Sequence, residues 1–394
     1  MKNLLLVLLC SSACGSAGAA LPDAFVVHVA AVTVSPATVS ARRGLDAPTQ
    51  LAVTAAFNNS KSVDVTSDAT WTSSDETVAK VSSSGLVTAI GVGMATITAS
   101  YEDVTASSIV TTTAPRIYMT ETSGTPGITI FDAYATGDTP PLASITGAAT
   151  TLAFPWADFV ANDEIYVSDN SAAAIDVWPI TATGNVAPSR RIIGALTKLQ
   201  VNYGLAVYNR EIYVAAMNEI LVFPDTATGN VAPSREIIGA TTGLSSSGYG
   251  LTIDHDEIYV TNSTTNSILV FPVSASGDVA PTRKLTGIPG LAFSNTYGLQ
   301  VANGELYVAD LSGVRTYLSS TTGLATPIRY LHGTDTGLGT VVGVNIVGSE
   351  LYSVNYSTGG IHVHPLKATG DAAPTRIISG GMTTISSPRY QFVY

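Results

Sequence analysis

Charged residues are scarce in this chain: Asp, Glu, Lys and Arg make up 12% of its 394 residues. Because soluble domains average about 25%, this scarcity excludes a disordered polyelectrolyte and a coiled coil. Basic residues are the scarcer kind, with 18 Lys and Arg against 29 Asp and Glu, which gives a net charge of −11. Nucleic acids and anionic membranes are bound through clustered basic side chains, so we expect neither as a partner.

Only two cysteines occur, Cys10 and Cys14, and both fall within the first 20 residues. There, Lys2 precedes the apolar run 4–9 and a stretch of small residues, a pattern that predicts an export signal over residues 1–20. The residues around Cys14, Ser-Ser-Ala-Cys-Gly, resemble a lipobox. Cys14 is therefore a candidate lipidation site that would carry a lipid anchor, and ordinary cleavage near residues 17–20 is the alternative.

The rest of the chain lacks cysteine, so it must fold without internal disulfides. It also lacks any run of about 18 uncharged apolar residues, so we expect no transmembrane span. Together with the export signal, these absences predict an exported bacterial protein of the cell envelope, the cell surface or the extracellular space.

Short alternating segments rich in β-branched residues fill residues 30–113. Period-two alternation between turn residues predicts half-buried strands, and about 80 residues of them suit one β-sandwich. Trp71 is the expected core anchor. Several phrases resemble the bacterial Ig-like group 2 domain: Val-Thr-Val-Ser-Pro (32–36), Ala-Thr-Trp-Thr-Ser-Ser-Asp (69–75), Val-Ser-Ser-Ser-Gly-Leu-Val-Thr (81–88) and Ala-Thr-Ile-Thr-Ala (95–99). The resemblance implies a non-catalytic display module of surface proteins and adhesins.

A repeat of 45 to 48 residues occupies residues 114–394. Its marker is the first residue of an Ile-Tyr-Val phrase, found at Ile117, Ile165, Ile212, Ile258, Leu306 and Leu351. Each unit contains four short apolar runs and no helical pattern. A period of this size with four strands per unit is typical of a propeller blade.

The two ends of the repeat region predict how the ring closes. The first unit lacks a leading strand, and the chain ends with an extra one at 389–394, whose frame matches 203–208. The fold class is therefore all-β: an Ig-like β-sandwich followed by a six-bladed β-propeller of four-stranded blades. The repeated pattern of Gly-x-x-Val, Ile-Tyr-Val-x-Asp and Ile-x-Val-Phe resembles NHL-type propellers, which implies a fold without implying one function.

Four positions after the markers, five of six units carry a carboxylate or amide; they are Glu121, Asp169, Asn262, Asp310 and Asn355, and Ala216 takes the sixth place. These oxygens could converge near the ring axis and bind Ca²⁺ or another divalent cation. The six-bladed lactonases and esterases that the repeat resembles hold a catalytic metal with Glu, Asn and Asp. Alternatively, each side chain caps the turn after its own strand, because Asp and Asn bond readily to nearby backbone.

Three further patterns have structural and functional interpretations. His362 and His364 share a strand face, as a metal pair would, but they align with apolar core positions of other units. Trp156, Tyr203, Tyr249 and Tyr297 recur at the start of the leading strand, where they could stack on a ligand or fill space between blades. In five of the six units an arginine begins the outer strand, namely Arg190, Arg235, Arg283, Arg329 and Arg376, and we expect these arginines to be solvated.

Two functions fit these observations. The first is a non-catalytic binding or scaffold protein, in which the Ig-like module spaces the propeller from the cell and a propeller face contacts a protein or glycan. The second is a metal-dependent hydrolase or lactonase of the pore. Uniform blades and the interruption at Ala216 favour the first, so we expect neither a catalytic residue nor a cofactor.

Overall fold

The computed structural model describes residues 27–245, 249–287, 293 and 296–394. The export signal expected over 1–20 and the candidate lipidation site Cys14 lie outside these residues. Within the described part, no helix is long and apolar enough to span a membrane. The chain forms two compact units, which we describe separately. One holds Ala47–Thr112 with the chain up to Ala41, and the other holds Thr113–Tyr394 with Arg42–Asp46.

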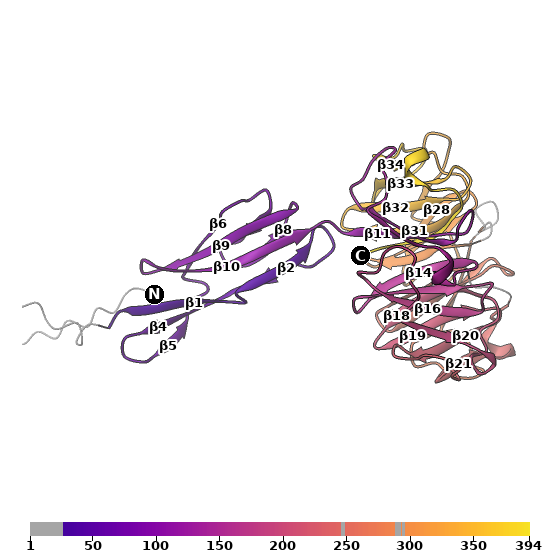
Figure 1. Ribbon diagram of the computed structural model, residues 1–394, viewed down its shortest axis with the longest axis horizontal. Helices are drawn as coiled ribbons and strands as arrows, with labels where there is room; N and C mark the ends of the chain where they lie inside the picture. Colours follow the sequence, from indigo (N-terminus) through magenta and orange to yellow (C-terminus); the bar gives the residue numbers. More distant parts are fainter. Residues whose placement is uncertain (1–26, 246–248, 288–292, 294–295) are drawn as a thin grey trace, which may run out of the picture. The chain divides into compact units, whose positions relative to one another are not determined.

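The first unit is an Ig-like β-sandwich (Figure 1). Its sheets, in strand order, are β1 (Val29–Ser35), β4 (Ala52–Phe57) and β5 (Ser62–Asp64); β2 (Thr38–Arg42), β10 (Val104–Thr113), β9 (Gly93–Tyr101) and β6 (Thr70–Ser73); and β3 (Thr49–Gln50), β8 (Leu86–Ala89) and β7 (Ala79–Val81). Successive side chains of a strand point to opposite faces of the sheet, so every second one enters the core. In β9, for example, Ala95, Ile97 and Ala99 are buried. Trp71 packs against this core and donates its indole N–H to the Thr66 carbonyl at 3.2 Å.

The second unit is a six-bladed propeller, counted over its described residues. The blades are β35 (Pro388–Val393), β11 (Arg116–Glu121), β12 (Gly127–Asp132) and β13 (Ala143–Thr146) in blade 1; β14 (Pro155–Ala161), β15 (Glu164–Asp169), β16 (Ala174–Pro179) and β17 (Arg190–Ile193) in blade 2; β18 (Asn202–Tyr208), β19 (Glu211–Ala216), β20 (Glu219–Pro224) and β21 (Arg235–Ile238) in blade 3; β22 (Leu251–Asp254), β23 (Glu257–Asn262), β24 (Ser267–Pro272) and β25 (Arg283–Gly287) in blade 4; β26 (Leu299–Ala302), β27 (Glu305–Asp310), β28 (Gly313–Leu318) and β30 (Arg329–Leu331) in blade 5; and β31 (Val341–Val347), β32 (Glu350–Asn355), β33 (Gly360–Pro365) and β34 (Arg376–Ile378) in blade 6.

The six innermost strands form a closed ring. Each contacts the next in the order β35, β14, β18, β22, β26 and β31, and β31 contacts β35 again. Blade 1 takes its innermost strand from the C-terminus, because β35 pairs antiparallel with β11 over Ile117–Val393 and Tyr118–Phe392. The end of the chain accordingly lies beside β11 in Figure 1. The all-β fold class expected from the sequence is confirmed.

The repeated Ala-Thr-Gly loops join neighbouring blades. After the third strand of blade 2, Gly184 donates its N–H to the Ser144 carbonyl of blade 1 at 2.6 Å. The next residue, Asn185, accepts the Ala149 N–H at 2.7 Å and so caps the short turn η2 (Ala148–Thr150). Corresponding residues cap η3 (Ala195–Thr197), η4 (Ala240–Thr242) and η5 (Gly381–Thr383). In blade 5 this loop instead forms β29 (Gly323–Ala325), which pairs parallel with β25.

The recurring arginines are not solvated as the sequence pattern suggested. Each binds the glutamate that begins the second strand of its own blade; the pairs are Arg190–Glu164, Arg235–Glu211, Arg283–Glu257, Arg329–Glu305 and Arg376–Glu350. Most also reach the following blade, as Arg235 does by donating to the Val273 carbonyl at 2.7 Å. The expectation failed because each pair joins residues 24 or 26 apart, which only strand pairing brings together.

Glycine is required where adjacent innermost strands approach each other. A Cβ added to Gly204 would lie 2.6 Å from the Leu251 backbone nitrogen in the next blade. We therefore expect Gly204→Ala to lower the free energy of unfolding by about 1–3 kcal/mol, the usual cost of overpacking. Gly381→Ala is the matched control, because nothing lies within 4 Å of its added Cβ. Equal melting temperatures for the two variants would contradict this prediction.

Candidate functional site

Asp169 binds the loop that leads into the innermost strand of its own blade. Its two oxygens accept the N–H groups of Ala153 at 2.6 Å and Phe154 at 2.9 Å, and one also accepts the Ala172 N–H at 3.1 Å. Asp169 is fully buried at the end of β15. Its carboxylate therefore fixes the end of the second strand to the entry of β14.

Three of the other residues make the same kind of connection. Asn262 donates to the Gly243 carbonyl at 2.7 Å, and Asn355 donates to the Gly337 carbonyl at 2.7 Å. Glu121 accepts the Ser387 N–H at 2.9 Å in the loop before β35. Asp310 differs, because it forms a buried ion pair with Arg315 and accepts the Ser312 N–H at 2.8 Å.

The structure thus directs the five predicted site residues toward loop backbone or, for Asp310, toward an arginine. In the part of the chain that the structure describes, no three His, Cys, Asp or Glu side chains gather as metal ligands would. Ala216, at the sixth position, offers no side-chain oxygen. The arrangement does not fit a pore cation held by these residues.

Thermal melting with added Ca²⁺ or with a chelator tests this arrangement directly. We expect neither added Ca²⁺ nor a chelator to change the melting temperature, because Asp169 already accepts backbone N–H groups and Asp310 is paired with Arg315. Asp169→Ala should cost roughly 0.5–2 kcal/mol, by analogy with the loss of a helix cap. A Ca²⁺-induced rise of many degrees that disappears in an Asp169→Ala/Asp310→Ala double variant would contradict the expectation.

The aromatic residues at the start of the innermost strands pack on one another. Ring centroids lie 4.9 Å apart for Trp156–Tyr203, 4.7 Å for Tyr203–Tyr249 and 5.1 Å for Tyr249–Tyr297. Trp156 also stacks on Tyr249 at 5.5 Å, although these rings come from blades 2 and 4. The aromatic side chains therefore meet toward the axis of the propeller, which agrees with the packing interpretation of this pattern.

Blade 1 contributes two different side chains to this cluster. Arg389 occupies the aromatic position, with its guanidinium carbon 5.0 Å from the Trp156 ring and 4.6 Å from the Tyr356 ring. Tyr390 takes the position of Gly204 and is 7% exposed. A Cβ added to Gly298, in blade 5, would lie 3.2 Å from the Tyr390 ring. Tyr390 thus fills space near the axis that the small residues of other blades leave open.

Sequence reasoning missed Asp158, which lies in β14 where blades 3 to 5 carry Leu205, Leu251 and Leu299. It is fully buried, and neither carboxylate oxygen has a hydrogen-bond partner among the described residues. Burial raises the pKa of Asp158 well above its usual value, so the protonated form is favoured. A carboxylate in an otherwise apolar position of the repeat is the signal that could have revealed it.

The two histidines of β33 are buried within blade 6. His362 is 5% exposed, and its Nδ1 lies 3.4 Å from the Thr336 carbonyl. His364 is fully buried, and neither of its ring nitrogens has a partner in the described residues. Burial lowers the pKa of both, to about 4 for His364. They occupy core positions and meet no third metal ligand among the described residues.

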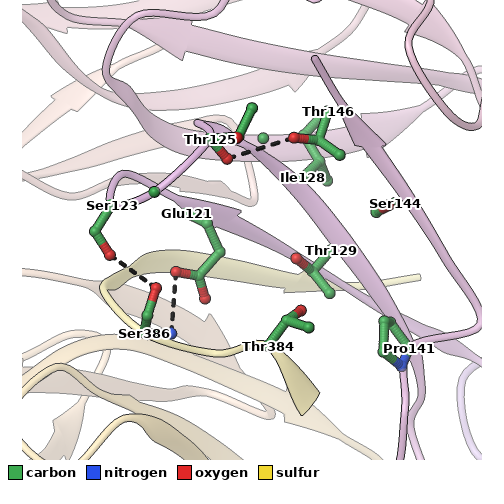
Figure 2. A pocket seen from close by; sticks show the side chains of 12 residues that line it. Glu121, Ser123, Thr125, Ile128, Thr129, Pro141, Ser144, Thr146, Thr384 and Ser386 are labelled. Carbon is green, nitrogen blue, oxygen red and sulfur yellow. Dashed lines mark hydrogen bonds between the residues drawn. The ribbon is translucent and has the colours of Figure 1, made fainter. Parts of the chain in front are cut away.

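A pocket of about 360 Å³ opens beside Glu121 on blade 1 (Figure 2). Seven of its twelve lining residues are serines or threonines, among them Thr129, Ser144 and Thr384. Glu121 is 5% exposed, and its Oε1 has no hydrogen-bond partner in the described part of the chain. Burial raises the pKa of Glu121 above its usual value. The sequence analysis identified Glu121 and missed the pocket.

Comparison with known proteins identifies the first unit. Residues 28–112 match the bacterial Ig-like domain (group 2), so the expected resemblance of this unit is confirmed. Domains of this family are typical of exported and surface proteins of bacteria. No curated protein matches the sequence significantly.

Among solved structures, a chain of a nidogen/laminin complex is similar with a TM-score of 0.50 and 12% identity, covering 71% of this chain and 98% of that one. A candidate 6-phosphogluconolactonase from Bacteroides fragilis has a TM-score of 0.46 and 13% identity, covering 87% of this chain and 93% of that one. At 12% identity, the similarity to the chain of the nidogen/laminin complex shows the fold alone.

Proposed function

We propose that the protein is an exported, non-catalytic binding protein of the bacterial cell surface. The Ig-like unit acts as a spacer, and one face of an NHL-type propeller contacts a protein or glycan. Residues 1–20 direct export, and Cys14 is where a lipid anchor would be attached. The observation that carries this proposal is that Asp169, Asn262 and Asn355, which were candidate ligands of a pore metal, each form a hydrogen bond with loop backbone, as turn caps do.

The binding surface that we propose is the Arg389 face, which consists of Phe154, Tyr356 and Arg389 together with Trp156, a packed ring that is only 8% exposed. The Arg389 guanidinium lies over all three rings, at 5.1 Å from Phe154, and Tyr356 is 38% exposed. Aromatic and arginine side chains are the types enriched at recognition surfaces, because they bring large contact area and a polar group together. This composition supports binding by contact rather than catalysis.

Binding of the full chain to an array of purified glycans and surface proteins tests the proposal. We expect saturable binding that Tyr356→Ala weakens at least tenfold. Tyr208→Ala is the matched control. Tyr208 is also a partly exposed aromatic residue, but it ends β18, whereas the position that corresponds to Arg389 is at the start of that strand. Hydrolysis of a lactone by the purified chain, lost on addition of a chelator, would contradict the non-catalytic function.

A further inference from the structure

Blade 1 differs from the other five blades at one pair of facing positions. In every blade, the third strand contributes one residue of this pair and the outer strand contributes the other. The pairs are Asp176–Arg191, Leu221–Glu236, Leu269–Lys284, Arg315–Tyr330 and His362–Ile377 in blades 2 to 6, and Thr129–Ser144 in blade 1. Only blade 1 carries two small side chains there. The pocket lies over this pair, because Thr129 and Ser144 both line it.

Glu121 supplies the charged group of this pocket. Its Oε2 accepts the Ser387 N–H at 2.9 Å, which fixes the carboxylate in place. Its Oε1 is buried without a partner in the described residues. Figure 2 shows Glu121, Thr129 and Thr384 around the pocket that all three line. A buried acceptor without a donor is costly unless a ligand or water supplies one.

We propose that this pocket binds one sugar unit, that is, a neutral ring compound with several adjacent hydroxyl groups. A ligand hydroxyl donates to Glu121 Oε1 in a charge-assisted hydrogen bond. Serine and threonine hydroxyls both donate and accept, and sugar hydroxyls match both roles. The volume of about 360 Å³ falls within the range of small-molecule sites.

Cationic ligands fit this pocket less well. A metal ion or an ammonium group is bound by acceptor atoms only. The hydroxyl hydrogens of the serines and threonines in the lining would therefore find no acceptor on such a ligand. Calcium sites are built largely from several carboxylates and carbonyls, whereas this pocket is lined by a single carboxylate. The polar but nearly neutral lining therefore favours a polyol over a cation.

The inference deepens the proposed function and rests on it for the biological role of binding, although no residue of the Arg389 face lines the pocket. The test is titration of the full chain with D-glucose, D-galactose, D-mannose and N-acetyl-D-glucosamine, followed by saturation-transfer NMR. We expect at least one sugar to bind saturably. Glu121→Gln should weaken its binding at least fivefold, because the amide oxygen is a weaker acceptor.

A second variant fills the pocket with side chains that the fold already accepts. Thr129→Leu/Ser144→Lys reproduces the Leu269–Lys284 pair of blade 4, and it should abolish sugar binding. Glu219→Gln is the matched control, because Glu219 also has a buried oxygen without a partner in the described residues but lies in blade 3. It should leave binding unchanged. If the filled variant does not fold, the comparison of Glu121→Gln with Glu219→Gln decides.

Three results would overturn the inference. They are no saturable binding of any of the four sugars, binding that the filled variant retains, and binding of Ca²⁺ or ethylammonium at Glu121 in place of a sugar. Glycan binding that depends on Tyr356 and is unchanged in the filled variant would support the proposed function while rejecting the sugar pocket. The two proposals therefore fail separately.

Discussion

A chain that ends at Ser387 should lose the stable propeller. Removing residues 388–394 deletes β35, which pairs with β11 and contacts both β14 and β31. It also removes the buried side chains of Tyr390 and Val393. Burial of each such side chain contributes about 1.5–3 kcal/mol, so the loss approaches the 5–15 kcal/mol that stabilises a typical domain.

Melting followed by circular dichroism, together with limited proteolysis, measures this effect. Tyr390→Ala separates the side chain from the strand, and it should cost about 3–5 kcal/mol because it opens a cavity among the inner rings. The truncation should have the larger effect, because it also leaves β11 without its partner. A soluble truncated chain with an unchanged melting temperature would show that β35 does not hold the ring together.

His364→Phe should stabilise the protein, and more so in acid. His364 occupies the core position that carries Phe131, Trp178, Phe223, Phe271 and Tyr317 in the other blades. Its ring nitrogens are buried without partners in the described residues, whereas phenylalanine has no polar atom to satisfy. The substitution therefore removes a cost that four of the other five blades avoid, since of the aligned residues only Tyr317 also buries a polar atom without a partner in the described residues.

The pH dependence follows from the depressed pKa of about 4 in the folded protein, which burial causes. The unfolded chain, with a pKa near 6.5, binds a proton that the folded chain does not. Stability from this residue is thus lost as the pH falls from about 6.5 to about 4, by on the order of 3 kcal/mol. The advantage of His364→Phe should be larger at pH 4.5 than at pH 7.5.

Titratable groups that wild type and variant share change the stability of both equally, so their effects cancel in this comparison. Burial raises the pKa of Asp176 to about 7, which affects stability in the opposite direction, but it does so in wild type and variant alike. His332→Phe is the control, because His332 is exposed. A stability difference that is the same at both pH values would contradict the assignment of a depressed pKa to His364.

The repeat made the fold predictable, because four apolar runs per 45 to 48 residues leave few alternatives to a blade. The candidate site was less predictable, because it depends on which strands pair. In five units, the glutamate before the Ile-Tyr-Val phrase and the arginine of the outer strand are both visible in the sequence, yet only the strand register joins Glu257 to Arg283. Likewise, Thr129 and Ser144 are unremarkable alone, and they form a pocket only as a facing pair.

The loops that reach back one blade have a consequence for synthesis. A blade that emerges first lacks the cap that its successor supplies, as η2 does until Asn185 is made. For blade 6 the cap comes from Asp138, which accepts the Met382 N–H of η5 at 2.7 Å although it lies early in the propeller sequence. The last cap therefore forms only when nearly the whole chain is available. A growing chain cannot complete the ring, so the ring stays open until translation is almost finished.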